Sequence, residues 1–338
     1  MLPDAINFVR KLSVRKLLNI LSVQISFSLS NLFKRPLVWG MPWFVSIEPA
    51  SVCNLSCLQC PVEQGDIARS NKFMDLNDYK ELLEEISGTT TILSLYFQGE
   101  PLMHKNFTEF VRLAAGKKIY TQTSTNAQLM TEEVCRDLVD AGLDRIIISL
   151  DGSDQESYST YRREGDIQKV TQGIRILNRM REQAGSRKPL IVVQFLVFRH
   201  NRDQVTDVKK MANNLGADRI WIKSAQIEYP ETADEWIPEG HDQSRYEKND
   251  LGNWKLRGKI RNRCRRLWQT MVVTSDGLVV PCCFDKRATY TMGQAGQQSI
   301  TRIWKGRGYQ DFRRKVLSSR KEIEMCTNCT EGIGRIIF

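Results

Sequence analysis

Residues 43–60 read WFVSIEPASVCNLSCLQC, and this stretch sets the expectation for the rest of the chain. Its apolar, β-branched beginning predicts a short strand over Phe44–Ile47. The loop that follows carries Cys53, Cys57 and Cys60 in a C-x3-C-x2-C spacing. Because three thiols stand on one short loop directly after a strand, we predict a metal or metal-cluster site there.

From this strand onward, short apolar runs alternate with segments whose apolar residues recur at helical spacing. The further runs are 91–97, 118–123, 145–150, 190–198 and 219–222. This alternation predicts an α/β fold with a parallel sheet, here a partial (β/α)6 TIM-like barrel with a small C-terminal α+β domain. In such barrels the functional residues lie at the carboxyl ends of the strands. The segments QGEP, STNA and SLDG follow the second, third and fourth strands, in agreement with that rule.

The chemistry of the three thiols favours an iron-sulfur cluster. Three thiolates can hold three irons of a 4Fe-4S cubane and leave the fourth iron open to a small molecule with an amine and a carboxylate. The alternative is zinc, which normally takes a fourth protein ligand, and His104 is the candidate for that ligand.

With this triad in this place, residues 43–225 resemble the radical S-adenosylmethionine (radical SAM) superfamily. Gln98-Gly99-Glu100-Pro101 is similar to the family's GGEP motif, with glutamine in the first position. The resemblance implies an S-adenosylmethionine cofactor and a catalytic 4Fe-4S cluster on Cys53, Cys57 and Cys60. The residues that it implies for cofactor binding are Gln59, Gln98, Gly99, Glu100, Pro101, Ser124, Asn126, Ser149 and Arg162; it assigns no catalytic acid or base.

Some of these assignments have simpler alternatives. Gln59 would contact adenine partly through its main chain, in a position where the family often has an aromatic residue. Ser124, Asn126 and Ser149 are of the residue types that cap helices. Arg162, expected to pair with the carboxylate of the cofactor, is alternatively a surface charge.

A second group of cysteines lies near the C-terminus. Its spacing, C-x17-C followed by C-x2-C, resembles the twitch module, a shortened relative of the SPASM domain. By this resemblance an auxiliary 4Fe-4S cluster is held by four thiolates, and a structural zinc ribbon is the alternative; the residues are Cys264, Cys282, Cys326 and Cys329. The surrounding sequence predicts a hairpin that turns at Asp276-Gly277 and a final helix over 300–317.

Two cysteines are left over. Cys135 lies on a helical apolar stripe and is interpreted as a buried structural thiol. Cys283 lies where sulfatase-maturing relatives carry an aspartate that is proposed as a base. A cysteine is not assigned that role, and Asp285 is the nearby candidate for the base.

Four segments are predicted along the chain. They are an N-terminal amphipathic helical segment (1–42), the radical SAM partial barrel (43–225), an acidic linker (226–253) and a twitch/SPASM-like auxiliary cluster domain (254–338). The linker carries eight acidic residues with several Pro and Gly, which predicts an irregular connection. A lid over the barrel mouth is the alternative.

The resemblance implies an enzyme, an oxidoreductase of dehydrogenase type with an unknown substrate. It would reductively cleave S-adenosylmethionine to a 5'-deoxyadenosyl radical, remove a substrate hydrogen atom, and oxidise or cross-link a small-molecule or peptide substrate with help from the auxiliary cluster. A ribosomal-peptide-modifying enzyme is the second hypothesis. A non-catalytic iron-sulfur carrier or membrane-associated binding protein is the third. A flavodoxin- or ferredoxin-like reductant is the implied protein partner.

Charge and cysteine content indicate the surroundings of the protein. Lys and Arg outnumber Asp and Glu by 49 to 39, a formal net charge of +10 that favours acidic partners. We interpret the basic run 255–266 as compensation for an anionic cluster, and do not favour a nucleic acid partner. Nine cysteines at short spacings indicate metal ligation in a reducing cytoplasm.

The uncharged stretch 17–33 carries too many polar side chains for a transmembrane span. It is predicted to cap the next domain or to lie on a membrane. Peripheral contact of residues 1–38 with anionic lipid at the inner membrane face is therefore a further hypothesis.

Overall fold

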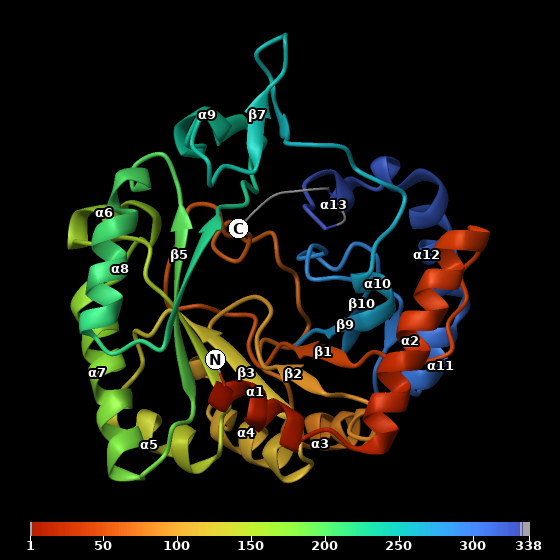
Figure 1. The fold of residues 1–338 in the computed structure, drawn as a ribbon, viewed down its shortest axis with the longest axis horizontal. Coiled ribbons are helices and arrows are strands. Elements are labelled where there is room, and N and C mark those ends of the chain that lie inside the picture. The colour runs from red at the N-terminus through yellow and green to blue at the C-terminus, as the bar shows by residue number, and fades with distance from the viewer. Residues whose placement is uncertain (1, 332, 334–338) are drawn as a thin grey trace. The chain divides into compact units, whose positions relative to one another are not determined.

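The computed structural model describes residues 2–331 and 333, and the chain divides into two compact units (Figure 1). Among the described residues, the first unit comprises 2–52, 67–122, 260–331 and 333, and the second comprises 53–66 and 123–259. Residues 1, 332 and 334–338 lie outside the described part, and with them the ends of the predicted segments 1–42 and 254–338.

The first unit is built on a sheet with the strand order β11-β10-β9-β1-β2-β3. Its strands are β1 (Phe44–Ile47), β2 (Ile92–Ser94), β3 (Tyr120–Thr125), β9 (Thr270–Val273), β10 (Leu278–Val280) and β11 (Gly293–Gln294). β1, β2 and β3 run parallel, as predicted. β3 continues from the first unit into the second at residue 123.

The C-terminal hairpin is confirmed, and it extends the sheet that β1 begins. β9 pairs parallel with β1, Phe44 lying opposite Thr270, while β9 and β10 are antiparallel. Gly277 has a φ of +81° in the turn between them, which glycine adopts without strain. β1 would otherwise expose an edge of unpaired backbone groups, which explains why the hairpin adds to this sheet.

Helices and 3-10 turns (η) surround this sheet. They are α1 (Leu2–Arg10), α2 (Val14–Phe33), α3 (Leu76–Ile86), η1 (Pro101–Met103), α4 (Phe107–Gly116), α10 (Arg266–Gln269), α11 (Ile300–Lys305), α12 (Arg307–Ser319), η4 (Arg320–Glu322) and α13 (Glu324–Thr327). The ring of Phe27 on α2 meets Trp268 on α10 edge-on, 5.5 Å between centroids. Helix α2 thus packs on α10. The final helix is interrupted at Gly306, whose backbone is extended.

The second unit contains the parallel order β4-β5-β6. Its elements are α5 (Glu132–Asp140), β4 (Arg145–Ser149), α6 (Gln155–Tyr161), α7 (Ile167–Gln183), β5 (Leu190–Val197), η2 (Arg202–Gln204), α8 (Val205–Asn214) and β6 (Arg219–Ser224). Figure 1 shows α7 and α8 running beside β5. Cys135 on α5 is fully buried, with its sulfur 3.9 Å from the Gly173 carbonyl, and is a structural thiol as predicted.

The acidic segment after β6 has more structure than an irregular connection. It contains η3 (Pro230–Thr232), α9 (Ala233–Trp236) and β7 (Tyr246–Lys248), which pairs antiparallel with β8 (Trp254–Leu256). The indole N–H of Trp254 donates to Asp234 at 2.9 Å. Buried apolar side chains, among them Ile227, Trp236 and Ile237, hold the segment in place together with polar contacts of this kind.

The α/β fold with a mostly parallel sheet is confirmed, and each of the six predicted strands is present. β1 has the predicted bounds, whereas β2 is shorter and β6 longer than expected. In the part of the chain that the structure describes, no helix combines the length and the apolar character that crossing a bilayer requires.

Candidate active site

The cluster loop, residues 53–60, has neither helix nor strand, and main-chain bonds fix it within the second unit. The N–H of Ser56 donates to the carbonyl of Arg163 over 3.3 Å, and the N–H of Cys60 donates to the carbonyl of Cys57 over 3.1 Å. Cys57 is buried, while Cys53 and Cys60 are half-buried. Main-chain hydrogen bonds to other residues thus hold the backbone of the loop, and none of its three thiols is part of a disulfide.

Arg162 points at this loop and is not a surface charge. Its Nε donates to the buried Asp151 carboxylate over 2.7 Å, and its Nη1 lies 4.0 Å from the Cys57 sulfur. Burial raises the pKa of the Cys57 thiol to about 12, and the Arg162 charge acts in the opposite direction. A cation here favours a thiolate, which is the form of cysteine that binds iron.

Asn126 reaches the same loop from the end of β3. Its amide nitrogen lies 3.6 Å from the Cys53 sulfur and donates to the side chain of Asn54 over 2.8 Å. Its side-chain oxygen accepts the N–H of Gln128 over 3.0 Å. Asn126 therefore orders the turn after β3 and also contacts the cluster loop.

Ser124 and Ser149 lie at the carboxyl ends of β3 and β4, as predicted. Ser124 is half-buried, and Ser149 is buried. Their assignment to the cofactor stays a prediction.

The side chain of Gln59 has a role that sequence reasoning missed. Its carbonyl oxygen accepts the N–H groups of Glu228 (2.9 Å) and Tyr229 (3.2 Å), and its amide donates to the Thr232 hydroxyl over 2.8 Å. The Tyr229 hydroxyl donates in turn to Asp66 over 2.9 Å. These bonds tie the start of the acidic segment to the cluster loop, and they confine any adenine contact of Gln59 to its main chain.

Gln59→Leu is expected to destabilise the protein by about 1–3 kcal/mol, because the N–H groups of Glu228 and Tyr229, both on half-buried residues, lose their acceptor. Urea unfolding of the two proteins measures the difference. Gln59→Glu keeps the acceptor and should cost less than the leucine variant. Equal unfolding midpoints for wild type and Gln59→Leu would show that the network contributes nothing.

The QGEP segment lies in the first unit, packed on the residues that immediately precede Cys53. The N–H of Glu100 donates to the Val52 carbonyl over 2.8 Å. Gly99 has a φ of +67°, and a Cβ built there would lie 2.5 Å from the Ala50 carbonyl oxygen. Only glycine satisfies both conditions. Glu100 is buried, and its carboxylate accepts the N–H of Leu102 over 3.1 Å, while Pro101 begins η1.

Glu48 is a further residue that the sequence did not indicate. This fully buried carboxylate accepts the N–H of Gln98 (3.2 Å) and of Ser275 (3.0 Å), and it pairs with Arg69 over 3.1 Å. One side chain thus joins the end of β1, the QGEP segment and the turn of the C-terminal hairpin. A glutamate after a strand is too common for its sequence position to signal this.

The four C-terminal cysteines are all buried in the first unit. Cys264 precedes α10, Cys282 follows β10, Cys326 lies on α13, and Cys329 follows α13. Burial raises the pKa of Cys264 to about 12 and also raises those of Cys326 and Cys329. Cys264 and Cys282 each lie close enough to Cys329 to feel its charge. The fold therefore gathers thiols that are far apart in the sequence.

Arg320 provides the test of whether an anionic cluster fits here. It is fully buried, donates to the carbonyls of Arg263 (2.8 Å) and Glu331 (2.6 Å), and lies beside Cys264, Cys326 and Cys329. Its guanidinium hydrogen-bonds to the Cys326 thiol. Its Nε and Nη2 are buried, and no nitrogen or oxygen of the described residues accepts from them. A thiolate-ligated 4Fe-4S cluster is negatively charged, and its sulfurs accept N–H bonds, so these residues fit such a group.

Cys283 and Asp285 adjoin these thiols but are arranged differently. The Cys283 sulfur accepts a hydrogen bond from Arg266 over 3.5 Å. The hydrogen bond from the Cys282 thiol lowers the pKa of Cys283 to about 6, and the positive charge of Arg266 acts in the same direction. Burial raises the pKa of Asp285, whose two oxygens accept the N–H groups of Thr289 and Tyr290. Asp285 thus holds a turn, which is a structural role.

His104, the candidate fourth ligand of a zinc ion, is not available to bind metal. Both ring nitrogens of His104 are engaged, one with the Met74 carbonyl (2.8 Å) and one with the Asn106 N–H (3.0 Å). Considering residues 2–331 and 333, no three His, Cys, Asp or Glu side chains are grouped so as to hold a single metal ion.

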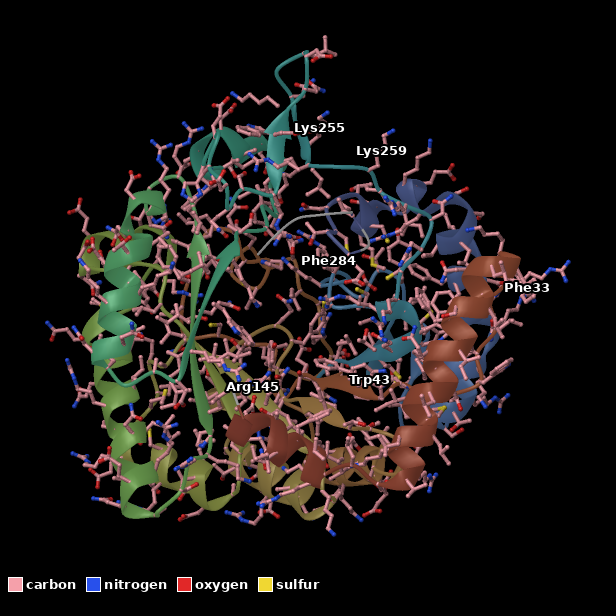
Figure 2. The ribbon with its side chains drawn as sticks, in the orientation of Figure 1. Phe33, Trp43, Arg145, Lys255, Lys259 and Phe284 are labelled. Carbon is pink, nitrogen blue, oxygen red and sulfur yellow. The ribbon has the colours of Figure 1, made fainter. Side chains whose placement is uncertain are left out.

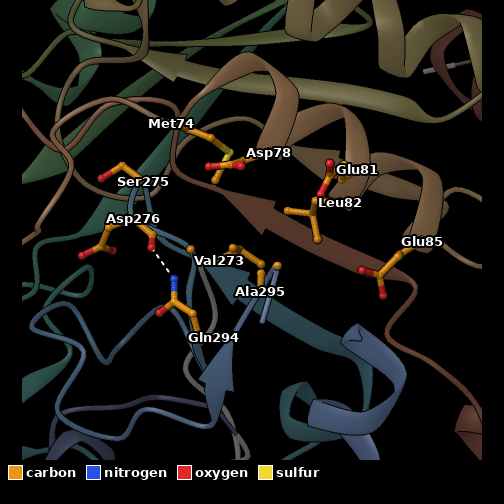
Figure 3. A pocket seen from close by; sticks show the side chains of 12 residues that line it. Met74, Asp78, Glu81, Leu82, Glu85, Val273, Ser275, Asp276, Gln294 and Ala295 are labelled. Carbon is orange, nitrogen blue, oxygen red and sulfur yellow. Dashed lines mark hydrogen bonds between the residues drawn. The ribbon is translucent and has the colours of Figure 1, made fainter. Parts of the chain in front are cut away.

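A pocket of about 80 Å3 in the first unit contains none of the predicted site residues (Figure 3). It lies between α3 and the hairpin turn, where Gln294 donates to the Asp276 carbonyl over 2.6 Å. Its volume holds only a few water molecules, so the candidate active site lies elsewhere.

Comparison with known proteins agrees with this arrangement. Residues 47–212 match the model of the radical SAM superfamily, and residues 264–330 match that of the SPASM iron-sulfur cluster-binding domain. The chain belongs to the radical SAM superfamily. Within that superfamily, it carries a C-terminal SPASM-type domain. Its cofactors are accordingly S-adenosylmethionine, a 4Fe-4S cluster and auxiliary iron-sulfur.

Two relatives illustrate the range of similar proteins. A tungsten-containing aldehyde ferredoxin oxidoreductase cofactor-modifying protein of Pyrococcus furiosus is 24% identical over 85% of this chain and 87% of its own length. The PqqA peptide cyclase of Bradyrhizobium diazoefficiens is 30% identical over 56% of this chain. The match covers 48% of that cyclase, so this chain spans about half of it.

Solved structures share the fold. BtrN in complex with AdoMet and 2-DOIA has a TM-score of 0.54 at 20% identity, covering 86% of this chain and 94% of that one. Streptococcus suis SuiB bound to S-adenosylmethionine has a TM-score of 0.62 at 14% identity, covering 82% and 68%. Identities at this level establish the architecture only.

Proposed function

We propose that this radical SAM enzyme is an oxidoreductase that removes a hydrogen atom from its substrate and then oxidises or cross-links it. When bound, S-adenosylmethionine and the catalytic cluster would supply a 5'-deoxyadenosyl radical. An auxiliary cluster would accept the second electron from the substrate, which also loses a proton. In alcohol oxidation the substrate thus loses one hydrogen atom, one electron and one proton, and becomes a ketone.

The proposed roles of the residues follow from their contacts. Cys53, Cys57 and Cys60 hold the catalytic cluster, and Arg162 stabilises the thiolate of Cys57. Glu100 and the main chain of Gly99 accept the ammonium group of the cofactor. Ligands of the auxiliary cluster are the four buried thiols that lie with Arg320: Cys264, Cys282, Cys326 and Cys329.

The observation that carries the redox part is Arg320 itself. A buried guanidinium that lies beside the auxiliary thiols and hydrogen-bonds to Cys326 stabilises a negatively charged group, and electron acceptance adds negative charge to a cluster. A zinc ion with four thiolates would not change charge on turnover, so stabilisation of added negative charge by Arg320 would not contribute to catalysis there.

A peptide-modifying enzyme is the second candidate, because the PqqA peptide cyclase is 30% identical over 56% of the chain. The two candidates share the same chemistry at the cofactor and differ in the substrate. A non-catalytic iron-sulfur carrier is a poorer explanation, since a carrier has no need of Gly99 and Glu100 packed against the residues before Cys53.

Anaerobically reconstituted protein, reduced by dithionite, should convert S-adenosylmethionine to 5'-deoxyadenosine and methionine. With a true substrate, 5'-deoxyadenosine and oxidised product are expected to form in a ratio of about 1:1. Panels of polyol substrates and of peptides distinguish the two enzymatic candidates. Intact S-adenosylmethionine would eliminate both in favour of a carrier, and product without net oxidation would remove the electron-acceptor role.

We also propose a reducing, cytoplasmic compartment with a flavodoxin- or ferredoxin-like reductant. None of the nine cysteines, all of which lie in the described part of the chain, forms a disulfide, and a reducing compartment keeps thiols available for iron. A peripheral position at the inner membrane face is part of this proposal, and helix α2 provides the support for it.

A further inference from the structure

Helix α2 exposes an apolar stripe, which the exposed Ser28 interrupts between Ile25 and Leu32. The side chains recur at helical spacing, so they share one face of the helix. Their exposed fractions are large for apolar residues: Val14 74%, Leu18 58%, Leu21 56%, Ile25 49% and Leu32 71%. A helix of a water-soluble domain normally turns such a face to the core.

The opposite face of α2, which packs on the protein, is partly polar. Lys16, Ser26 and Ser30 are buried there. Lys16 donates to the Lys118 carbonyl over 2.7 Å, and the two serine hydroxyls donate to carbonyls of α2 itself. Apolar residues Val23 and Phe27 complete this inner face. The outward face is thus more apolar than the inward one, the reverse of the usual arrangement.

Further exposed apolar side chains lie before and after the stripe in the sequence. Val9 on α1 is 60% exposed. Phe33, at the end of α2, is 59% exposed and is labelled in Figure 2. Trp39 is also exposed. Exposed aromatic residues together with aliphatic ones are typical of helices at the boundary between lipid headgroups and acyl chains.

Charge around the stripe has a single sign. Residues 5–47 contain no Asp or Glu, but they contain six Lys and Arg. Arg10 precedes the stripe, Arg15 lies at its beginning, and Lys34 and Arg35 follow it; all four are exposed. Basic residues beside an apolar helix face are complementary to anionic lipid headgroups.

We propose that this outward face of α2 lies in the plane of an anionic lipid bilayer, as an interfacial helix about 30 Å long. The inner face keeps its contacts with α10, so the helix lies on the membrane and does not cross it. A second copy of the chain is a poorer occupant, because pairing two such faces would bring basic ends together. This inference rests on the cytoplasmic placement proposed above, but it does not depend on the chemistry of the enzyme.

Vesicle sedimentation of the full-length protein tests the proposal, with vesicles of phosphatidylcholine alone and of phosphatidylcholine with phosphatidylglycerol. Wild type should bind the anionic vesicles, and less strongly at high salt. Leu18→Ser/Leu21→Ser/Ile25→Ser should weaken binding by about tenfold or more, because the buried apolar area is lost. The matched control is Leu251→Ser, a residue 84% exposed in the turn between β7 and β8; it should bind as wild type does.

Formation of 5'-deoxyadenosine, measured on the same samples, keeps the two proposals separate. The triple serine variant should retain wild-type cleavage without vesicles. Absence of vesicle binding by an active wild type would overturn the membrane proposal and leave the enzymatic one intact. Unchanged binding by the triple variant would also overturn it. The proposal would also be overturned if the wild type formed a dimer that the triple substitution dissociates but that anionic vesicles leave intact.

Discussion

Replacing Cys53, Cys57 and Cys60 together by alanine is expected to abolish cleavage of S-adenosylmethionine. Without these thiolates no cluster with an open iron is held, and the rate should fall by about a thousandfold or more. Iron should fall from about eight to about four per chain, because the other cluster stays on its own ligands. Iron and sulfide analysis, with 5'-deoxyadenosine measured under dithionite, checks both numbers.

Cys135→Ala is the matched control for this experiment. It also removes a buried thiol from the second unit, but one that lies against the Gly173 carbonyl, away from the cluster loop. Both iron content and cleavage should be unchanged. Retention of about eight irons by the triple variant would mean that other residues hold the catalytic cluster.

Replacing Cys326 and Cys329 by alanine should remove the auxiliary cluster and leave the catalytic one. Iron is expected to fall to about four per chain, while cleavage of S-adenosylmethionine continues without oxidised product. The cluster would join segments that are far apart in sequence, so its loss should also lower stability. A loss of several kcal/mol corresponds to a melting temperature about 5–10 °C lower for a chain of this size.

Cys283→Ser is the control for the auxiliary site, since Cys283 adjoins Cys282 and is not assigned as a ligand. This variant should keep about eight irons and its melting temperature. If Cys283→Ser loses iron and the Cys326→Ala/Cys329→Ala variant keeps it, the ligand assignment is wrong. Zinc in place of iron in anaerobically purified protein would contradict the redox role of this site.

Strands and cysteine spacings were predictable because both are local. β1 begins and ends where its apolar run does, at Phe44 and Ile47, and side chains on a strand alternate by a rule that needs no tertiary information. The helix over 300–317 was harder to delimit, because its break depends on the extended backbone of Gly306. The pairing of β9 with β1 could not be predicted from the sequence of either strand, because backbone hydrogen bonds allow a strand to pair with many others.

Site residues divide in the same way. Gly99 was found from its motif, and its positive φ and its contact with the Ala50 carbonyl give the reason for a glycine there. Glu48 and Arg320 were missed, because charged residues are mostly exposed and the sequence does not show that these two are buried. Gln59 was expected to contact adenine partly through its main chain, and the partners of its side chain, Glu228 and Tyr229, lie about 170 positions away.

The order of residues alone determined the α/β class, the thiol triad after the first strand and the family, because periodicity and ligand spacing are properties of neighbouring positions. Only the folded chain decided which distant groups meet. Glu48 joins three segments, Arg320 lies among the auxiliary thiols, and α2 turns its apolar side outward. Such contacts arise from packing, which depends on the whole chain at once, so no local pattern records them.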